Sequence, residues 1–218
     1  MEIGHYDLSE EILIKVTAIR KNMLLDNIDH AFREVEVLSG LDIRKGQMEE
    51  AELGLTNVLQ TYRGVLGDDH HNILFAQHSI ARVYYAQGQG SEAEELSLRT
   101  IEAWERNYGE DGLQTLLSTT NLVFIYKTQS RLEESGVVGI RALELAKRLG
   151  PVGDLVTAVI EGELARTLCL MDRRAEAIPS IEDNIRLRKK VHGEHSPYTE
   201  LEAVELATLK QELAPAGR

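Results

Sequence analysis

Residues 88–93 read Gly-Gln-Gly-Ser-Glu-Ala, and a related phrase returns every 42 residues along the chain. The other three phrases are Gly46-Gln-Met-Glu-Glu-Ala51, Ser130-Arg-Leu-Glu-Glu-Ser135 and Asp172-Arg-Arg-Ala-Glu-Ala177. A fixed period of this length predicts a stack of similar supersecondary repeats, each packed on the next, in place of one globular core.

Each repeat reads as two helices joined by a short turn. Apolar residues recur at steps of three and four over residues 73–87, which predicts the first helix of the second repeat. Residues 88–90 interrupt this pattern, and we expect Ser91 to cap a second helix that ends at Gly109. Pro179 lies in the second helix of the last repeat, where we expect it to kink that helix or to delay its start.

Other columns keep the same register. A large apolar residue is followed by a small or β-branched one at Ile80-Ala81, Leu122-Val123, Leu164-Ala165 and Leu206-Ala207. We expect Ala81 and Ala165 to be buried between two helices, because a small side chain lets helices approach closely. We also expect the glycines inside second helices to let a neighbouring helix approach closely. They are Gly54, Gly136 and Gly139. Glycines that predict helix ends are Gly67, Gly109, Gly150 and Gly193.

The repeat divides the chain into three regions and makes it all-α. We predict an N-terminal capping helix within residues 1–27, four 42-residue repeats over residues 28–195, and a C-terminal capping helix with a tail over residues 196–218. The last helix is expected from about Pro197 to Glu212. Capping helices are expected because the open ends of a solenoid otherwise expose apolar faces.

Composition excludes several classes of function. Hydrophobic residues make up 43% of the 218 residues and aromatic residues 5%, a balance that favours helices with aliphatic cores. The formal charge of −12 would repel a phosphate backbone, so we expect no nucleic-acid partner. A single cysteine allows no internal disulfide. Without a signal peptide or an apolar run of membrane length, we expect a cytoplasmic protein with no membrane partner.

The second repeat carries a family resemblance. Ile80-Ala81-Arg82-Val83-Tyr84, followed by Gln87-Gly88-Gln89-Gly90-Ser91-Glu92-Ala93-Glu94, resembles a tetratricopeptide repeat. The 42-residue period, with Leu66-Gly67-Asp68-Asp69-His70 between repeats, is similar to the longer variety found in kinesin light chains. The resemblance covers about residues 28 to 212. It implies a right-handed α-α superhelix (a tetratricopeptide-like solenoid) whose first helices line a concave groove that binds peptides.

The exposed stripe of each first helix can be read by spacing at steps of three and four. In the second, third and fourth repeats the stripes are Phe75, His78, Arg82, Tyr85; Leu117, Thr120, Phe124, Lys127; and Val159, Gly162, Arg166, Cys169. In the first repeat and the closing helix they are Arg33, Glu36, Gly40, Ile43; and Leu201, Val204, Thr208, Gln211. The candidate ligand-binding residues, which include one from a neighbouring column, are Phe75, His78, Arg82, Tyr85, Leu117, Asn121, Phe124, Lys127 and Arg166.

These residues predict the chemistry of the ligand. Arginines among aromatic side chains are common anchors of binding sites, so we expect an acidic or amphipathic peptide or protein partner. Gly40, Gly162 and Cys169 would leave room for it. The alternative is that the apolar members simply pack on neighbouring helices. In the column of Asn121, kinesin-light-chain-like repeats usually carry asparagine, whereas the other three repeats and the closing helix here carry Val37, Ser79, Glu163 and Glu205. The ligand is therefore smaller or different in kind from a generic extended peptide, and a small molecule stays open.

Catalytic signals are weak. The chain has no GxxxxGK[S/T], GxSxG, HExxH or Cys-x-x-Cys motif, and we expect no cofactor and no metal. The enzymatic alternative is an isomerase or cyclase. Its acid–base cluster would be His78, Tyr85 and Glu163. The reading we favour is a non-enzymatic binding module. A third alternative is a self-associating segment of a larger protein, and a homodimer stays open.

Overall fold

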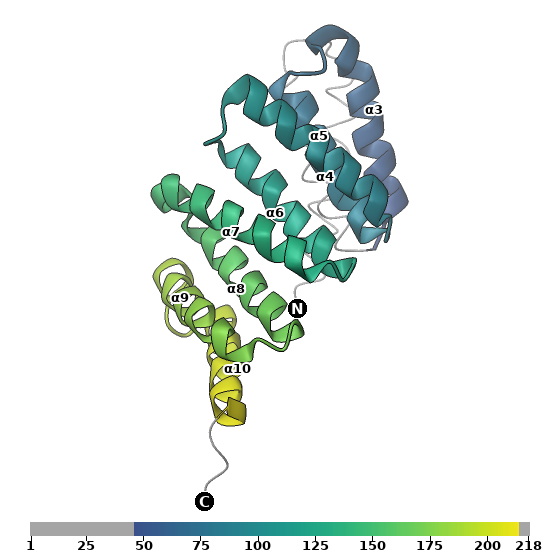
Figure 1. Cartoon of the computed structure of the whole chain (residues 1–218). Coiled ribbons are helices and arrows are strands. Elements are labelled where there is room, and N and C mark those ends of the chain that lie inside the picture. Colours follow the sequence, from purple (N-terminus) through teal and green to yellow (C-terminus); the bar gives the residue numbers. More distant parts are fainter. Residues whose placement is uncertain (1–45, 214–218) are drawn as a thin grey trace, which may run out of the picture. The chain divides into compact units, whose positions relative to one another are not determined.

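The computed structural model describes residues 46–213, and within this range every regular element is helical. The α-helices, labelled in Figure 1, are α3 (Met48–Leu66), α4 (His71–Ala86), α5 (Gly90–Tyr108), α6 (Leu113–Thr128), α7 (Leu132–Arg148), α8 (Asp154–Leu170), α9 (Arg174–His192) and α10 (Pro197–Leu213). A short 3-10 helix, Gly150–Val152, joins α7 to α8. The predicted leading helix and the first helix of the first repeat lie outside the described residues.

Contacts divide the chain into two compact units, Met1–Asn107 and Tyr108–Arg218. In the described part of the first unit, α3 packs on α4 and α5 through a buried cluster built on Ala51, Leu55, Ile80 and Val83. A second cluster, formed by Leu74, Phe75, Ala103 and Trp104, joins α4 to α5. Ala81 is fully buried, as its place in the repeat predicted.

The second unit is a run of helices in which each packs on the next, from α6 to α10 (Figure 1). Leu116, Ala142, Ala146 and Ile160 belong to one buried cluster that joins α6, α7 and α8. A second cluster joins α8, α9 and α10, and its buried members are Ala165, Ala177, Ile181 and Leu209. The burial expected of Ala165 is confirmed, and so is a last helix that begins at Pro197.

The helix ends follow the glycines. Gly67, Gly109, Gly150 and Gly193 all have positive φ, which glycine adopts without strain. The expected cap at Ser91 is wrong, because α5 already begins at Gly90. The amide of Ala93 donates to the carbonyl of Gln89, which leaves Ser91 inside the first turn. The tight turn before α5, where the Gln89 amide bonds back to Tyr84, restarts the helix earlier than the serine signal suggests.

The expectations for proline and glycine inside the second helices have different outcomes. Helix α9 begins at Arg174 and runs through Pro179, so the expected delayed start is wrong, and the expected kink stays a prediction. Gly139 confirms close packing, since a Cβ there would lie 2.6 Å from Leu164 Cδ2. For Gly136 the expectation is wrong, because a Cβ there would meet nothing within 4 Å.

Candidate functional site

A cavity of about 520 Å³ lies in the second unit among α6, α8, α9 and α10. It is lined by Lys127, Arg166, Cys169, Leu170, Arg174, Glu205, Thr208, Leu209 and Glu212. Four of these, Lys127, Arg166, Cys169 and Thr208, were placed on the groove stripes by spacing alone. The structure therefore brings residues from three first-helix positions to one hollow, and two of them are candidate ligand-binding residues.

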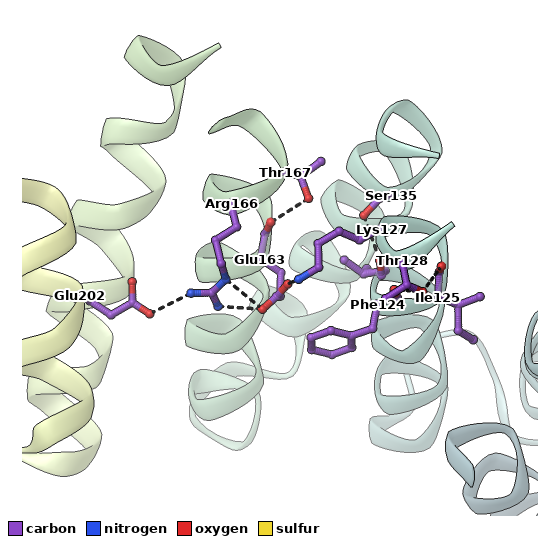
Figure 2. Close-up of polar contacts among 10 residues, drawn as sticks. Phe124, Ile125, Lys127, Thr128, Ser135, Glu163, Arg166, Thr167 and Glu202 are labelled. Carbon is purple, nitrogen blue, oxygen red and sulfur yellow. Dashed lines mark hydrogen bonds and ion pairs between the residues drawn. The ribbon is translucent and has the colours of Figure 1, made fainter. Parts of the chain in front are cut away.

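One buried carboxylate holds the two candidate cations of this cavity. Glu163 is 6% exposed, and its Oε2 accepts a hydrogen bond from Lys127 Nζ. Its Oε1 accepts from Arg166 Nη2 at 2.7 Å and from Arg166 Nε at 3.2 Å. Figure 2 shows Glu163 between Lys127 and Arg166, which come from α6 and α8. Glu163 is thus the fixed partner of two cations.

A second buried carboxylate lies on the other side of Arg166. Glu202 of α10 is 3.5 Å from Arg166 Nη1 (Figure 2). The same carboxylate is also 3.6 Å from Arg188 Nη2 of α9. Burial opposes the charged form of the Arg166 guanidinium, but the hydrogen bond to Glu163 and the nearby carboxylates outweigh burial and raise its pKa. Arg166 therefore stays charged and is held on two sides.

The room expected at Gly162 is already filled. A Cβ at Gly162 would lie 2.6 Å from Asn184 Nδ2 and 3.1 Å from Arg166 Nη2, so the expectation of open space there is wrong. Asn184 is fully buried, and its Oδ1 accepts from Arg188 Nε at 2.6 Å. The missing side chain of Gly162 lets α9 approach α8. Cys169, by contrast, does line the cavity.

The remaining α6 candidates lie along the same helix as Lys127. Leu117, Asn121 and Phe124 are each half-buried, and none of them lines the cavity. The Lys127 ammonium lies 5.6 Å from the centre of the Phe124 ring, close enough for a cation–π contact. Phe124 therefore contacts Lys127 through its ring face, and a contact of Phe124 with a ligand stays a prediction.

The α4 candidates belong to the first unit. Arg82 is exposed, Phe75 and Tyr85 are half-buried, and His78 is only 7% exposed. The Phe75 and His78 rings lie 5.7 Å apart. Burial, helped by the charge of Arg82, lowers the pKa of His78 to about 3. Because these residues and the α6 to α10 cavity lie in different units, one surface shared by both sets stays a prediction.

This environment bears on the enzymatic alternative. A histidine with a pKa of about 3 is neutral at physiological pH, so it has no proton to give as a general acid and is a weak general base. Glu163 is committed to Lys127 and Arg166. Burial, followed by the charge of Glu205, raises the pKa of the Cys169 thiol, which disfavours a thiolate nucleophile. Two of the three residues named for catalysis, His78 and Glu163, are therefore not poised for acid–base chemistry in this structure.

Spacing on the first helices missed part of the cavity wall. The residues it did not single out for binding are Leu170, Arg174, Glu205, Leu209 and Glu212. Arg174 is the first residue of α9 and pairs with Glu212 of α10 at 3.1 Å. The groove stripes belong to the first helices of the repeats, so they do not include a side chain at the start of a second helix. Glu205 could have been found, because it stands in the column of Asn121.

A separate cavity of about 510 Å³ lies in the first unit among α3, α4 and α5. None of the candidate residues of α4 lines it. Two of its carboxylates are already paired, Asp68 with Arg63 and Asp69 with Arg106 at 2.7 Å. Across the described residues there is no group of three or more histidine, cysteine or acidic side chains placed to hold a metal ion. In the same range, no helix is both long enough and apolar enough to span a bilayer.

Family comparison agrees with the repeat structure. Tetratricopeptide repeat models match residues 37–96, 76–148 and 162–198. The chain belongs to the tetratricopeptide repeat family. The sequence matches no curated protein.

Solved structures support the same fold. A kinesin-light-chain protein of Podosopora anserina with nearly identical TPR-like repeats has a TM-score of 0.70 at 22% identity, covering 86% of this chain and 88% of that one. BtubC from P. vanneervenii has a TM-score of 0.71 at 16% identity, covering 88% and 77%. A Rap protein in complex with competence and sporulation factor has a TM-score of 0.61 at 16% identity, covering 96% and 60%. The fold is an all-α tetratricopeptide superhelix of the kinesin-light-chain type, the fold of a protein-interaction module.

Proposed function

We propose that this chain is a non-enzymatic binding module that takes an amphipathic peptide into the cavity of the second unit and pairs with an acidic side chain of that peptide. The observation that carries the proposal is the makeup of the cavity wall, where three cations stand beside apolar surface. The cations are Lys127, Arg166 and Arg174, and the apolar members are Leu170 and Leu209. Forked hydrogen bonds to a guanidinium favour carboxylates, and the leucines favour apolar area.

The cations differ in how firmly they are held. Lys127 and Arg166 share Glu163, whose side chain is 8% exposed, so these contacts are shielded from water. Arg174 and Glu212 form a pair at 3.1 Å with side chains 47% and 51% exposed. An exposed pair of this kind contributes about 0–1 kcal/mol. A peptide carboxylate can therefore replace Glu212 as the partner of Arg174 with little loss of folding free energy. Glu163 stays bound to Lys127 and Arg166.

This difference assigns roles within the cavity. Arg174 is the cation that meets the peptide carboxylate, and the Glu163 network is the scaffold that fixes Lys127 and Arg166 before binding. A scaffold formed in advance reduces the ordering that binding requires. Glu205 and Glu212 keep the wall from being purely basic, which favours a peptide of mixed charge over a polyanion.

The experiment is a selection from a displayed library of random 12-residue peptides on the wild-type chain. Enriched peptides are then measured by fluorescence anisotropy against two variants, Arg174→Ala and Arg186→Ala. Arg186 is a matched control, since it also lies on α9, pairs with Asp183 at 2.9 Å and does not line the cavity. We expect Arg174→Ala to weaken binding at least tenfold and Arg186→Ala to leave it within twofold.

Two results would contradict the proposal. One is a selection that enriches no peptide, and the other is an enriched set that binds Arg174→Ala and Arg186→Ala equally. The cavity volume also falls within the range of small-molecule sites. A small-molecule ligand would appear as a compound whose binding depends on Arg174 while no peptide is enriched.

A further inference from the structure

One face of α10 is uncovered although the same face of the preceding first helices is covered. On α6 this face is buried throughout, at Leu116, Thr119, Val123 and Tyr126. On α8 it is buried or half-buried, at Ala158, Glu161, Ala165 and Leu168. On α10, the register-equivalent residues are all exposed: Glu200, Ala203, Ala207 and Lys210.

The covered faces show what this surface normally contacts. On α6, the Ser135 hydroxyl of α7 donates to the Val123 carbonyl at 2.9 Å. On α8, Ala165 packs with Ala177 and Ile181 of α9. The partner in each case is the second helix of the same repeat. The uncovered face of α10 is therefore of a kind that, elsewhere in this unit, is packed against another helix.

The opposite side of α10 is already used. Thr199, Glu202 and Leu209 are 1%, 3% and 7% exposed, and Leu209 belongs to the cluster that joins α8 to α9. Val204, which flanks the uncovered face, is 64% exposed. Helix α10 thus seals the preceding hairpin with one side and presents two alanines between two charged side chains on the other.

We propose that this face binds the same face of a second copy of the chain. The two α10 helices run antiparallel, and the two-fold axis crosses them at the level of residue 205 along the helix. Positions 200 and 210 are symmetric about 205, and so are positions 203 and 207. The pairing places Glu200 opposite Lys210 of the partner subunit, and Ala203 opposite Ala207 of the partner subunit. A two-fold interface requires this kind of self-complementarity, because each contact occurs twice with the roles exchanged.

The charge order is what selects a second copy over an unrelated helix. The face has an acid at one end, a base at the other and alanines between them, so it complements itself when reversed. The alanines allow the two helix axes to approach closely, and Val204 adds apolar area at the edge. Lys210 already bonds Glu182 at 2.7 Å, with both side chains about half exposed, so in the pair it lies between two carboxylates.

The first test is sedimentation equilibrium on the full chain with charge reversals. We expect the wild type to form a concentration-dependent dimer. Glu200→Lys and Lys210→Glu each place like charges opposite one another and should raise the dimer dissociation constant at least tenfold. The double variant restores opposite charges and should return the constant to within threefold of wild type. Far-ultraviolet circular dichroism of each variant checks that helicity is unchanged.

The second test fixes the antiparallel register. Cys169 is the single cysteine, so Cys169→Ser provides a background without thiols. In this background, a mixture of Ala203→Cys and Ala207→Cys chains should form a disulfide-linked dimer on mild oxidation, and either chain alone should form far less. A monomer at every concentration would overturn the proposal and leave the face to a helix from a different protein. A dimer unaffected by both charge reversals would overturn it as well.

Discussion

Lys127 and Arg166 lie on different helices, α6 and α8, and both bond the same carboxylate, that of Glu163. The two cations approach different oxygens of Glu163, so one buried carboxylate links α6 to α8 through both of them (Figure 2). Removing the acid would leave two partly buried cations without their shared partner. This relationship makes the carboxylate a structural element of the site and gives the first prediction.

Glu163→Gln should destabilise the fold by about 1–3 kcal/mol. Breaking a fully buried pair costs about 3–5 kcal/mol, and the lower figure applies because the Arg166 side chain is 37% exposed. The control is Glu182→Gln, which breaks an exposed pair with Lys210 and should cost less than about 1 kcal/mol. Urea unfolding monitored by circular dichroism measures both. Equal stabilities of the two variants would show that Glu163 has no structural role.

His78 makes stability depend on pH. Its pKa of about 3 in the folded chain lies below the unfolded value of 6.5, so the unfolded chain binds more protons between these values. Stability is therefore full above pH 6.5 and is lost as pH falls toward 3, at up to about 1.4 kcal/mol per pH unit. The difference in unfolding free energy between wild type and His78→Gln, measured from pH 7 to pH 4, should shrink as pH falls.

Two glycines of α7 form a matched pair. Gly136→Ala adds a methyl group that meets nothing within 4 Å and should stabilise the helix by about 0.5–1 kcal/mol. Gly139→Ala places its Cβ 2.6 Å from Leu164 Cδ2, and the forced repacking should destabilise by about 1–2 kcal/mol. Opposite shifts of the urea midpoint are expected. Shifts of the same sign would remove the packing argument for Gly139.

Ala81→Leu tests the register of the repeat. Ala81 is 0% exposed, so the larger side chain should overpack the contact and cost about 1–3 kcal/mol. Ala86→Leu, at an exposed position near the end of the same helix, should change stability by less than about 0.5 kcal/mol. Thermal unfolding of the two variants gives the comparison. If Ala81→Leu melts at the wild-type temperature, the column does not lie between helices.

Part of the candidate site could be predicted because it follows the same period as the fold. Lys127 and Arg166 were placed on groove stripes by adding 42 to positions of the second repeat, and they do line one cavity. Arg174 was missed because it starts a second helix, where no stripe was read. The missing side chain of Gly162 predicts open space, but Asn184 of the next helix fills that space.

The sequence by itself determined the local and periodic features. Helical spacing, the 42-residue register and the recurring glycines place the C-terminal ends of α3, α5, α7 and α9 and the burial of Ala81 and Ala165, because each depends on backbone geometry repeated along one chain. Only the tertiary structure decided which charges meet. Whether Glu163 is a ligand contact or the shared partner of Lys127 and Arg166 depends on how far side chains reach between packed helices. Periodicity carries no information about that reach.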